Sequence, residues 1–256
     1  MLIVLPPSEG KTPPAEGSPV DPASLVHAGE LGAKRERLLE TLVRVASGNE
    51  KRALRALDLT PNQVGELELD RNLLTAPAGP AIGVYTGVLY ERLAFTGLPA
   101  GSRARAAERL LIASALWGML RPDDRIPAYR LSMKAKLPRI PSLAAWWRPA
   151  LAKALAADDR PDRLVVDMRS AAYVAAWKPK NATRVGIRAF TGPASNRKAI
   201  THMAKAVRGE ITAVLLETDE EPATPGDLAS IIEAAGYTVE TTAGTVDILF
   251  DDFYSG

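Results

Sequence analysis

The sequence contains no cysteine, which excludes disulfide bonds, thiolate metal sites and thiol redox chemistry. Histidine is nearly as scarce: only His27 and His202 occur, far apart along the chain, so we expect neither a histidine-rich metal site nor a nucleophilic triad. No apolar run approaches the roughly 20 residues of a membrane-spanning helix. The start, MLIVLPP, lacks the charged region of a signal peptide. We therefore expect a cytoplasmic protein with no metal, no cofactor and no membrane partner.

Positive charge is absent from residues 209–256, which carry 11 acidic residues and no lysine or arginine. The middle of the chain has the opposite bias: residues 103–208 contain 22 lysines and arginines against 7 acids. The formal net charge of +2 therefore hides a strongly basic block. Such a block is typical of a surface that binds a polyanion.

The chain of 256 residues, 46% of them apolar, is long enough to bury a large core. Apolar runs and periodicities predict strands and helices in irregular alternation, with no internal repeat and no clean domain boundary. The sequence therefore predicts a mixed α/β (α+β) fold, a single compact unit over residues 1–256 with a mixed sheet and helices. We expect strands at 2–5, 164–168, 183–190 and 211–216, helices at 31–46, 102–109, 142–157, 196–208 and 225–235, a linker at 76–82, and a hairpin of 237–242 with 246–250.

The stretch SALWGMLRPDDRIPAYRLSMKAKLPR, residues 114–139, is the most informative part of the basic block. Its six cations outnumber its two acids, and Trp117 and Tyr129 lie among them. Gly118 and Pro122 mark a stiff turn rather than a flexible tail. A rigid basic turn with interleaved aromatic residues can grip a phosphodiester backbone and stack on bases. The alternative is a solvated charged loop whose aromatic residues belong to the core.

A second basic stretch, WKPKNATRVGIR at 177–188, contains four cations and no acid. On a strand, Arg184, Gly186 and Arg188 fall on one face, so two guanidinium groups would project together. Single charges on an exposed strand are normal, but two acid-free basic stretches in one block favour polyanion binding.

Four ordered motifs give the chain a resemblance to a known family. The residue order x-S-x-L-[WY]-G-x-L-R-P-x-D-x-x-x-P-Y-R-L-x-M resembles the signature of the YaaA family of bacterial peroxide stress proteins. Similar blocks are PPSEGKT at 6–12, where the family usually has SPAKT, the triplet YTG at 85–87, and VVDMRSAAYVAAWKPK at 165–180. The chain departs from the pattern in that Pro127 stands two residues before Tyr129 rather than next to it. The signature residues are Ser114, Leu116, Trp117, Gly118, Leu120, Arg121, Pro122, Asp124, Tyr129, Arg130, Leu131 and Met133.

The resemblance covers nearly the whole chain and implies a cytoplasmic protein that protects cells during peroxide stress. It also implies binding of double-stranded DNA through a positively charged cleft and a helix-hairpin-helix-like element, which would map onto Trp117–Tyr129. Gly118 stands alone there rather than in a G-x-G pair, which departs from a standard hairpin. Without cysteine, protection must act on DNA or on iron availability rather than by thiol scavenging. The residues expected to contact DNA are Arg121, Tyr129, Arg130, Lys134, Lys136, Lys178, Lys180, Arg184 and Arg188.

Polar side chains follow two of the predicted buried strands. Ser8 and Lys11 come after the first strand, and Asp167, Arg169 and Ser170 end or follow the strand at 164–168. Open sheets place their ligand sites at such strand ends, so we expect a shared cleft. Its expected lining is Ser8, Lys11, Tyr85, Thr86, Trp117, Asp124, Asp167, Arg169 and Ser170.

The cleft supports a second hypothesis, an enzyme that acts on a nucleotide, a nucleobase or damaged DNA. The catalytic candidates are Lys11, Asp167 and Tyr85, with Asp167 as general base or polar anchor. Each has a simpler interpretation: a lysine in a surface loop, an aspartate capping the next helix, a tyrosine in the core. An ATP-binding P-loop is rejected, because Leu5 stands where that motif needs glycine. A third and weakest hypothesis is a partner-binding role anchored by the adjacent tryptophans at 146–147.

Overall fold

An eight-stranded sheet runs through the molecule, and its central strand β1 (Leu2–Leu5) is completely buried. The computed structural model describes residues 1–192, 197–200, 203–242 and 244–250. The central strands are parallel, as expected for strands that are apolar on both faces. In spatial order the strands are β4 (Gly118–Leu120), β3 (Leu110–Ser114), β1, β6 (Leu164–Asp167), β7 (Thr183–Thr191), β10 (Thr245–Phe250) and β9 (Thr238–Thr242), with β8 (Lys198–Ala199) paired to β7; β4, β8 and β9 are antiparallel to their neighbours.

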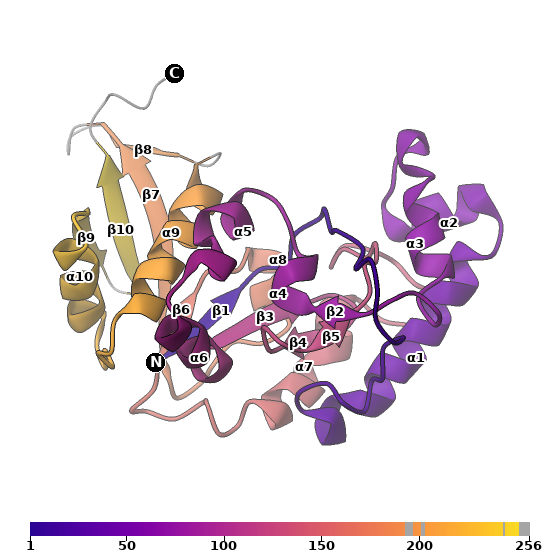
Figure 1. Ribbon diagram of the computed structural model, residues 1–256, viewed down its shortest axis with the longest axis horizontal. Coiled ribbons are helices and arrows are strands. Elements are labelled where there is room, and N and C mark those ends of the chain that lie inside the picture. The colour runs from indigo at the N-terminus through magenta and orange to yellow at the C-terminus, as the bar shows by residue number, and fades with distance from the viewer. Residues whose placement is uncertain (193–196, 201–202, 243, 251–256) are drawn as a thin grey trace.

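Helices cover the sheet and extend the molecule at one end (Figure 1). The helices α1 (Ala28–Ala46), α2 (Glu50–Leu57) and α3 (Glu66–Arg71) lie at the end opposite β9 and α10. A small second sheet pairs β2 (Gly79–Pro80) with β5 (Arg125–Ile126). The remaining helices are α4 (Ala81–Val84), α5 (Val88–Leu93), α6 (Ala100–Arg109), α7 (Leu143–Ala154), α8 (Ala171–Val174), α9 (Ala204–Glu217) and α10 (Pro225–Ala234), with single 3₁₀ turns at Pro61–Gln63 and Phe95–Gly97. No helix among the described residues is both long and apolar enough to cross a bilayer.

The order of the parallel strands creates a topological switch point between β1 and β6. From β1 the chain passes to β3 on one side, and it later returns to place β6 on the other side. The two strands are in register, with Val4 opposite Asp167, and the Met168 N–H donates to the Val4 carbonyl at 2.9 Å. The segments that leave the carboxyl ends of β1 and β6 therefore diverge from adjacent points, which is where open α/β sheets bind their ligands.

The buried side chain of Arg35 joins α1 to the core. Its guanidinium donates to the backbone carbonyls of Trp117 at 3.0 Å, Met119 at 2.9 Å, Val26 at 2.8 Å and Leu25 at 3.4 Å. Burial lowers its pKa to about 10, against a smaller effect of Asp124 in the other direction. One buried cation thus supplies hydrogen bonds to four backbone carbonyls, of which the Trp117 carbonyl also accepts the Met119 N–H at 3.1 Å.

Most of the predicted elements are confirmed, and three predictions are wrong. Residues 211–216 are not a strand but the middle of α9, which packs on α5, α6, α10 and β7 and is therefore apolar on several faces. Residues 76–82 are not a free linker, because they contain β2 and the start of α4. The helix predicted at 196–208 begins only at Ala204, and Lys198–Ala199 form β8 instead; residues 196, 201 and 202 lie outside the described residues.

The structure of the basic segment at 114–139 also differs from the predicted hairpin. Residues 115–142 contain β4 and β5 but no helix, so the helix-hairpin-helix-like element is not shown at Trp117–Tyr129. The two strands do not pair with each other, since β4 extends the main sheet and β5 pairs with β2. The segment is held by packing instead: Gly118 has a φ of 77°, and a Cβ there would lie 2.9 Å from the Trp147 ring. The segment is therefore held in one position, as predicted for a stiff turn, but it packs as part of the core rather than as an exposed hairpin.

Replacing Arg35 with methionine should lower the free energy of unfolding by about 2–4 kcal/mol, because four backbone carbonyls would lose a hydrogen-bond donor inside the protein. Urea denaturation measures this change. The control is Arg37→Met, at an exposed position two residues away, which should change stability by no more than about 0.5 kcal/mol. Equal effects of the two substitutions would show that the carbonyl contacts of Arg35 do not contribute.

Candidate functional site

The loop that leaves β1 folds onto the segment between α4 and α5. Pro6 and Pro7 offer no N–H groups, so the strand cannot continue its ladder beyond Leu5. The Thr86 N–H donates to Ser8 Oγ at 2.9 Å, and Lys11 pairs with Tyr85 in an isolated antiparallel bridge. The structure thus brings together Ser8, Lys11, Tyr85 and Thr86, four residues expected in one cleft.

Lys11 is held against aromatic rings rather than against a carboxylate. Its Nζ donates to the backbone carbonyls of Ser8 at 2.9 Å and Glu9 at 3.4 Å. The same atom lies 4.2 Å from the centre of the Tyr129 ring and 5.5 Å from that of Tyr85. Burial lowers the pKa of Lys11 to about 8, more than the nearby Glu9 carboxylate raises it. Removing the proton from the Lys11 amine near neutral pH therefore requires little free energy, which is a property of catalytic lysines.

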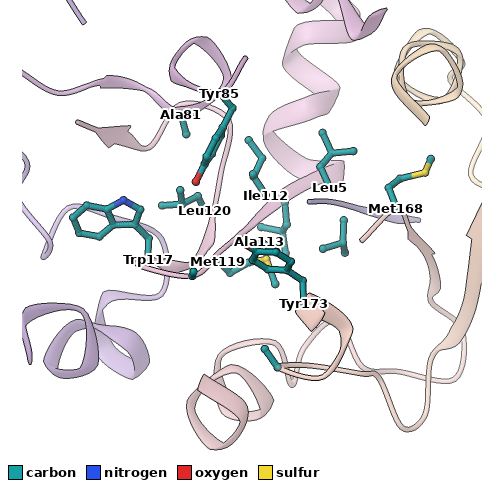
Figure 2. Packing of buried hydrophobic residues seen from close by; sticks show 14 of the residues in the cluster. Leu5, Ala81, Tyr85, Ile112, Ala113, Trp117, Met119, Leu120, Met168 and Tyr173 are labelled. Atoms are coloured by element: carbon teal, nitrogen blue, oxygen red, sulfur yellow. The ribbon is translucent and has the colours of Figure 1, made fainter. Parts of the chain in front are cut away.

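A chain of buried hydroxyl groups lies next to Lys11. The hydroxyls of Tyr85 and Tyr129 are 2.8 Å apart, and the Tyr129 hydroxyl is 2.7 Å from Ser114 Oγ, which also accepts the Trp117 N–H. Figure 2 shows the Tyr85 side chain reaching into the core towards Leu120 and Trp117. Burial raises the pKa of Tyr85 to about 12, so the phenol stays protonated and serves as a hydrogen-bond donor.

Asp70, on α3, is a buried carboxyl group next to the backbone of Arg130, and it was not predicted from the sequence. Its Oδ1 accepts the Arg130 N–H at 2.8 Å, and among the described residues its Oδ2 has no hydrogen-bond partner. Burial raises the pKa of Asp70 to about 8, against the effects of that N–H group and of the Lys11 charge. The charges of Lys11 and Asp70 influence each other, and burial brings the pKa of both groups to about 8. Groups shifted in this way concentrate at functional sites.

A cavity of about 450 Å³ opens at the switch point, and we call it the strand-end cavity. Its lining includes Ser8 and Glu9 after β1, Ser170 and Tyr173 after β6, and α5. A smaller cavity of about 210 Å³ adjoins it, because Glu9, Ser170 and Tyr173 line both. Two cations of α9, Lys205 and Arg208, complete the lining of the larger cavity.

Asp167 does not join Lys11 but binds two guanidinium groups. Arg169 donates to both carboxylate oxygens at 2.8 Å, and Arg184 Nε donates to Oδ2 at 2.6 Å. Burial alone would raise the pKa of Asp167, yet these guanidinium groups outweigh it and hold the pKa below its ordinary value. A carboxylate engaged in this way holds the two arginines in place, whereas the role predicted for it was a general base or polar anchor in a cleft shared with Lys11.

The two arginines held by Asp167 lie in a second hollow of about 750 Å³, which we call the basic groove. Its cations come from separate elements, and its described lining contains no acidic residue. Three of them are exposed, and in the described part of the chain no carboxylate pairs with their side chains. Trp177 and Pro149 supply apolar surface between the charges. The cations are Arg148 from α7, Arg169 before α8, Lys178 and Lys180 after it, and Arg184 from β7; the exposed ones are Arg148, Lys178 and Lys180.

Other residues expected to contact DNA are used inside the protein. Tyr129 and Trp117 are buried, so they cannot stack on a base in this conformation, and the alternative that they belong to the core holds. Arg121 donates to the carbonyls of Glu108 and Leu110. Arg130 forms an ion pair with Glu9 at 2.8 Å. Their sequence motif therefore serves packing around the site.

Of the remaining predicted residues, only Lys134 lines one of these hollows. Lys134 and Lys136 are exposed, and Lys134 lines the smaller cavity. Arg188 is on the same face of β7 as Arg184, as predicted from the alternation, but binds Asp247 at 2.6 Å. Asp124 accepts the N–H groups of Arg121 and Val26, so it fixes a turn rather than lining a cavity.

Sequence reasoning missed two residues whose signal lies only in the fold. Asp70 sits in an ordinary acidic helix start, ELELDR, and nothing in that pattern marks one carboxyl as buried. Arg148 follows two tryptophans on α7 and joins the basic groove only because α7 lies beside α8, where its guanidinium donates to the Ala175 carbonyl. Tertiary packing, not spacing, brings both to their sites.

Comparison with known proteins gives a match to a family model and to several relatives. The family model described as "Peroxide stress protein YaaA" matches residues 1–243. A UPF0246 protein of Streptomyces coelicolor is 44% identical over 246 residues, which is 95% of this chain and 93% of that protein. A UPF0246 protein of Corynebacterium efficiens is 37% identical over 97% of this chain and 98% of its own. A protein of Campylobacter jejuni that is named uncharacterized is 29% identical over 84% of each chain.

Replacing Asp70 with asparagine should change how stability depends on pH. The folded-state pKa of about 8 lies above the ordinary value, so folding takes up a proton between the two and wild-type stability falls as the pH rises through that window. Asparagine cannot ionise but keeps an acceptor for the Arg130 N–H. The variant should therefore gain about 2 kcal/mol or more relative to wild type between pH ~5 and pH ~8, since each tenfold change in proton affinity corresponds to about 1.4 kcal/mol.

Urea unfolding of both proteins at the two pH values measures this difference. Glu36→Gln, which removes an exposed carboxylate on α1, is the control and should shift stability equally at both. A stability difference between D70N and wild type that does not vary with pH would mean that Asp70 is ionised in the folded protein.

Proposed function

The chain belongs to the peroxide stress protein YaaA family, and we propose that it binds double-stranded DNA through the basic groove as part of a response to hydrogen peroxide. The observation that carries the proposal is the groove itself, where exposed cations from α7 and from the segment after α8 have no carboxylate partner among the described residues. Such a role places the protein in the cytoplasm.

The groove has the chemistry that a phosphate backbone requires. Lys178 and Lys180 are exposed point charges on a segment stiffened by Pro179, and Arg148 offers a planar donor set. Backbone N–H groups of residues 180–182 donate to Asp159, so the loop that carries the lysines is held in place. Contacts of this kind position a duplex without reading its sequence. The grip requires no helix-hairpin-helix-like element.

The peroxide role rests on the family and on the absence of cysteine. A chain without thiols cannot reduce peroxide by sulfenate chemistry, so protection has to act on a target of peroxide damage. DNA is such a target, and a sequence-independent grip on its backbone suits a protective function. Expression of the wild-type protein in a strain that lacks its own YaaA should restore growth in hydrogen peroxide.

Replacing Lys178 and Lys180 together with alanine should weaken duplex binding and make it less sensitive to salt. Wild-type affinity should fall steeply between roughly 50 and 200 mM salt, and the plot of log affinity against log salt should lose about 2 in slope, since each phosphate contact contributes about 0.9. Fluorescence anisotropy with a labelled duplex measures both quantities. The same variant should fail to restore growth in hydrogen peroxide.

The matched control is Lys51→Ala with Arg52→Ala, two exposed cations on α2 at the far end of the molecule (Figure 1). It removes the same charge and should leave the slope nearly unchanged. If both double variants lose affinity equally, DNA responds to overall charge and the groove is not the binding site.

A second candidate function, an enzyme that acts on a nucleotide, a nucleobase or damaged DNA, is favoured by one observation. Lys11, with a pKa of about 8, lies beside the buried hydroxyl chain and within the loop that lines the strand-end cavity. A neutral amine there can act as a base or as a nucleophile, while the protonated hydroxyls of Tyr85 and Tyr129 can donate hydrogen bonds. Asp167 has no part in this version, because its carboxylate is occupied by arginines.

Mass spectrometry of oligonucleotides and mononucleotides carrying oxidised bases tests the second candidate. The wild-type protein should convert at least one of them, and Lys11→Met should abolish the conversion. The double variant of Lys178 and Lys180 is informative here too: it should reduce turnover of oligonucleotides and leave mononucleotides unaffected. Unchanged turnover in Lys11→Met would remove Lys11 from the chemistry.

A further inference from the structure

The strand-end cavity has a charged end and an apolar end. Lys205 and Arg208 are one helical turn apart on α9, so both side chains face the cavity. In the described residues no carboxylate pairs with either of them. The one acid of the lining, Glu9, is neutralised by Arg130 at 2.8 Å. The cavity therefore carries two positive charges at the α9 side; Arg208 also donates to the Ile187 carbonyl at 3.4 Å, and its charge is partly compensated by that of Asp167.

The apolar end is built from rigid groups. The ring of Tyr90 is fixed, because its hydroxyl donates to the Pro6 carbonyl at 2.8 Å, and Pro6 and Pro7 form the adjoining wall. Tyr173 stands between the strand-end cavity and the smaller one, with its ring near the core in Figure 2. Stacking on such rings tolerates any base.

The distance between the two ends is fixed by a close helix contact. A Cβ at Gly209 would lie 2.2 Å from the Leu89 carbonyl, so α9 and α5 approach each other as closely as backbones allow. Lys205 and Arg208 precede Gly209 on α9, whereas Val88, Leu89 and Tyr90 belong to α5. The helix pair thus presents the cations and the apolar wall to one cavity.

We propose that the strand-end cavity binds a nucleoside monophosphate, with the phosphate between Lys205 and Arg208 and the base on the apolar side near Tyr173. A dianionic phosphate matches the two cations, and a flat base matches the apolar wall. A volume of about 450 Å³ falls within the range of small-ligand sites, and the switch point is where open sheets place them. The site uses the cavity of the second candidate function but holds whether or not Lys11 performs chemistry.

The nucleotide has two possible sources, and both supply a phosphate group and a base. It is either a free nucleotide or one nucleotide of a strand whose backbone lies in the basic groove. The second source is available because α8 separates the two hollows: Ala171 and Val174 line the groove, while Ser170 and Tyr173 line the cavity. Enzymes that act on bases extrude single nucleotides into such pockets.

Isothermal titration with the four deoxynucleoside 5′-monophosphates tests the free-nucleotide source. At least one should bind, and the same nucleoside without phosphate should bind about tenfold more weakly or worse, because charge-assisted hydrogen bonds are lost. Ribose 5-phosphate should also bind about tenfold more weakly, because it offers no base to stack. Binding of ribose 5-phosphate as tight as that of the nucleotide would overturn the assignment of the base.

Lys205→Gln should lower the nucleotide affinity by about tenfold. Lys205 is exposed, so this variant folds even if Arg208→Gln, at a partly buried position, does not. The control is Lys178→Gln, which removes an exposed lysine on the groove side of α8 and should leave nucleotide affinity within about twofold, since salt screens distant surface charges. Equal losses in the two variants would place the nucleotide outside the cavity and overturn the proposal.

A duplex with a single-nucleotide bulge tests the second source. If the cavity takes its nucleotide from a strand, the wild-type protein should bind the bulged duplex about tenfold more tightly than the paired one, and Lys205→Gln should remove that preference. If mononucleotides bind and the two duplexes bind equally, the ligand is a free nucleotide. Absence of both mononucleotide binding and bulge preference overturns the proposal, whereas absence of all duplex binding would count against the groove alone.

Discussion

The placement of β1 between two parallel neighbours is the constraint on which the rest of the structure depends. A strand of four apolar residues can be completely buried only if both its edges are paired and both its faces are covered. Its two prolines then force the chain out of the sheet at a point adjacent to the end of β6. The loop carrying Ser8 and Lys11 and the segment before α8 start side by side for this reason. The strand-end cavity is a consequence of sheet topology rather than of any single motif.

Several arginines are engaged by groups of the protein itself. Arg35 binds backbone carbonyls in the core, Arg121 binds two more, and Arg130 and Arg188 form ion pairs. The excess of positive charge in the middle of the chain therefore overstates the charge of the surface. Among the many exposed cations, Arg148, Lys178 and Lys180 line the basic groove and Lys205 lines the strand-end cavity. The loop that carries Lys178 and Lys180 is already held by Asp159, which lowers the ordering cost of any ligand binding there.

Local sequence patterns predicted the elements correctly where the apolar residues follow the period of a strand or a helix. The strand at 164–168 and the hairpin of β9 and β10 followed from apolar runs and turns. The prediction failed at 211–216, because a helix packed on several sides loses its amphipathic period and resembles a strand. At the site, Ser8 and Lys11 could be predicted because they directly follow a buried strand, and open sheets bind ligands at strand ends. Asp70 stayed hidden, because its burial depends on how α3 packs against the segment of Tyr129, and no local spacing records that contact.

Helix α8 separates the basic groove from the two cavities beside it. Ala171 and Val174 line the groove, Tyr173 lines the strand-end cavity and Ala172 lines the smaller cavity, so inserting or deleting one residue would turn the side chains that follow by about 100° and disturb all three hollows. Single side chains on one side can therefore be exchanged independently, whereas a change in the length of this helix alters the groove and the cavities at once.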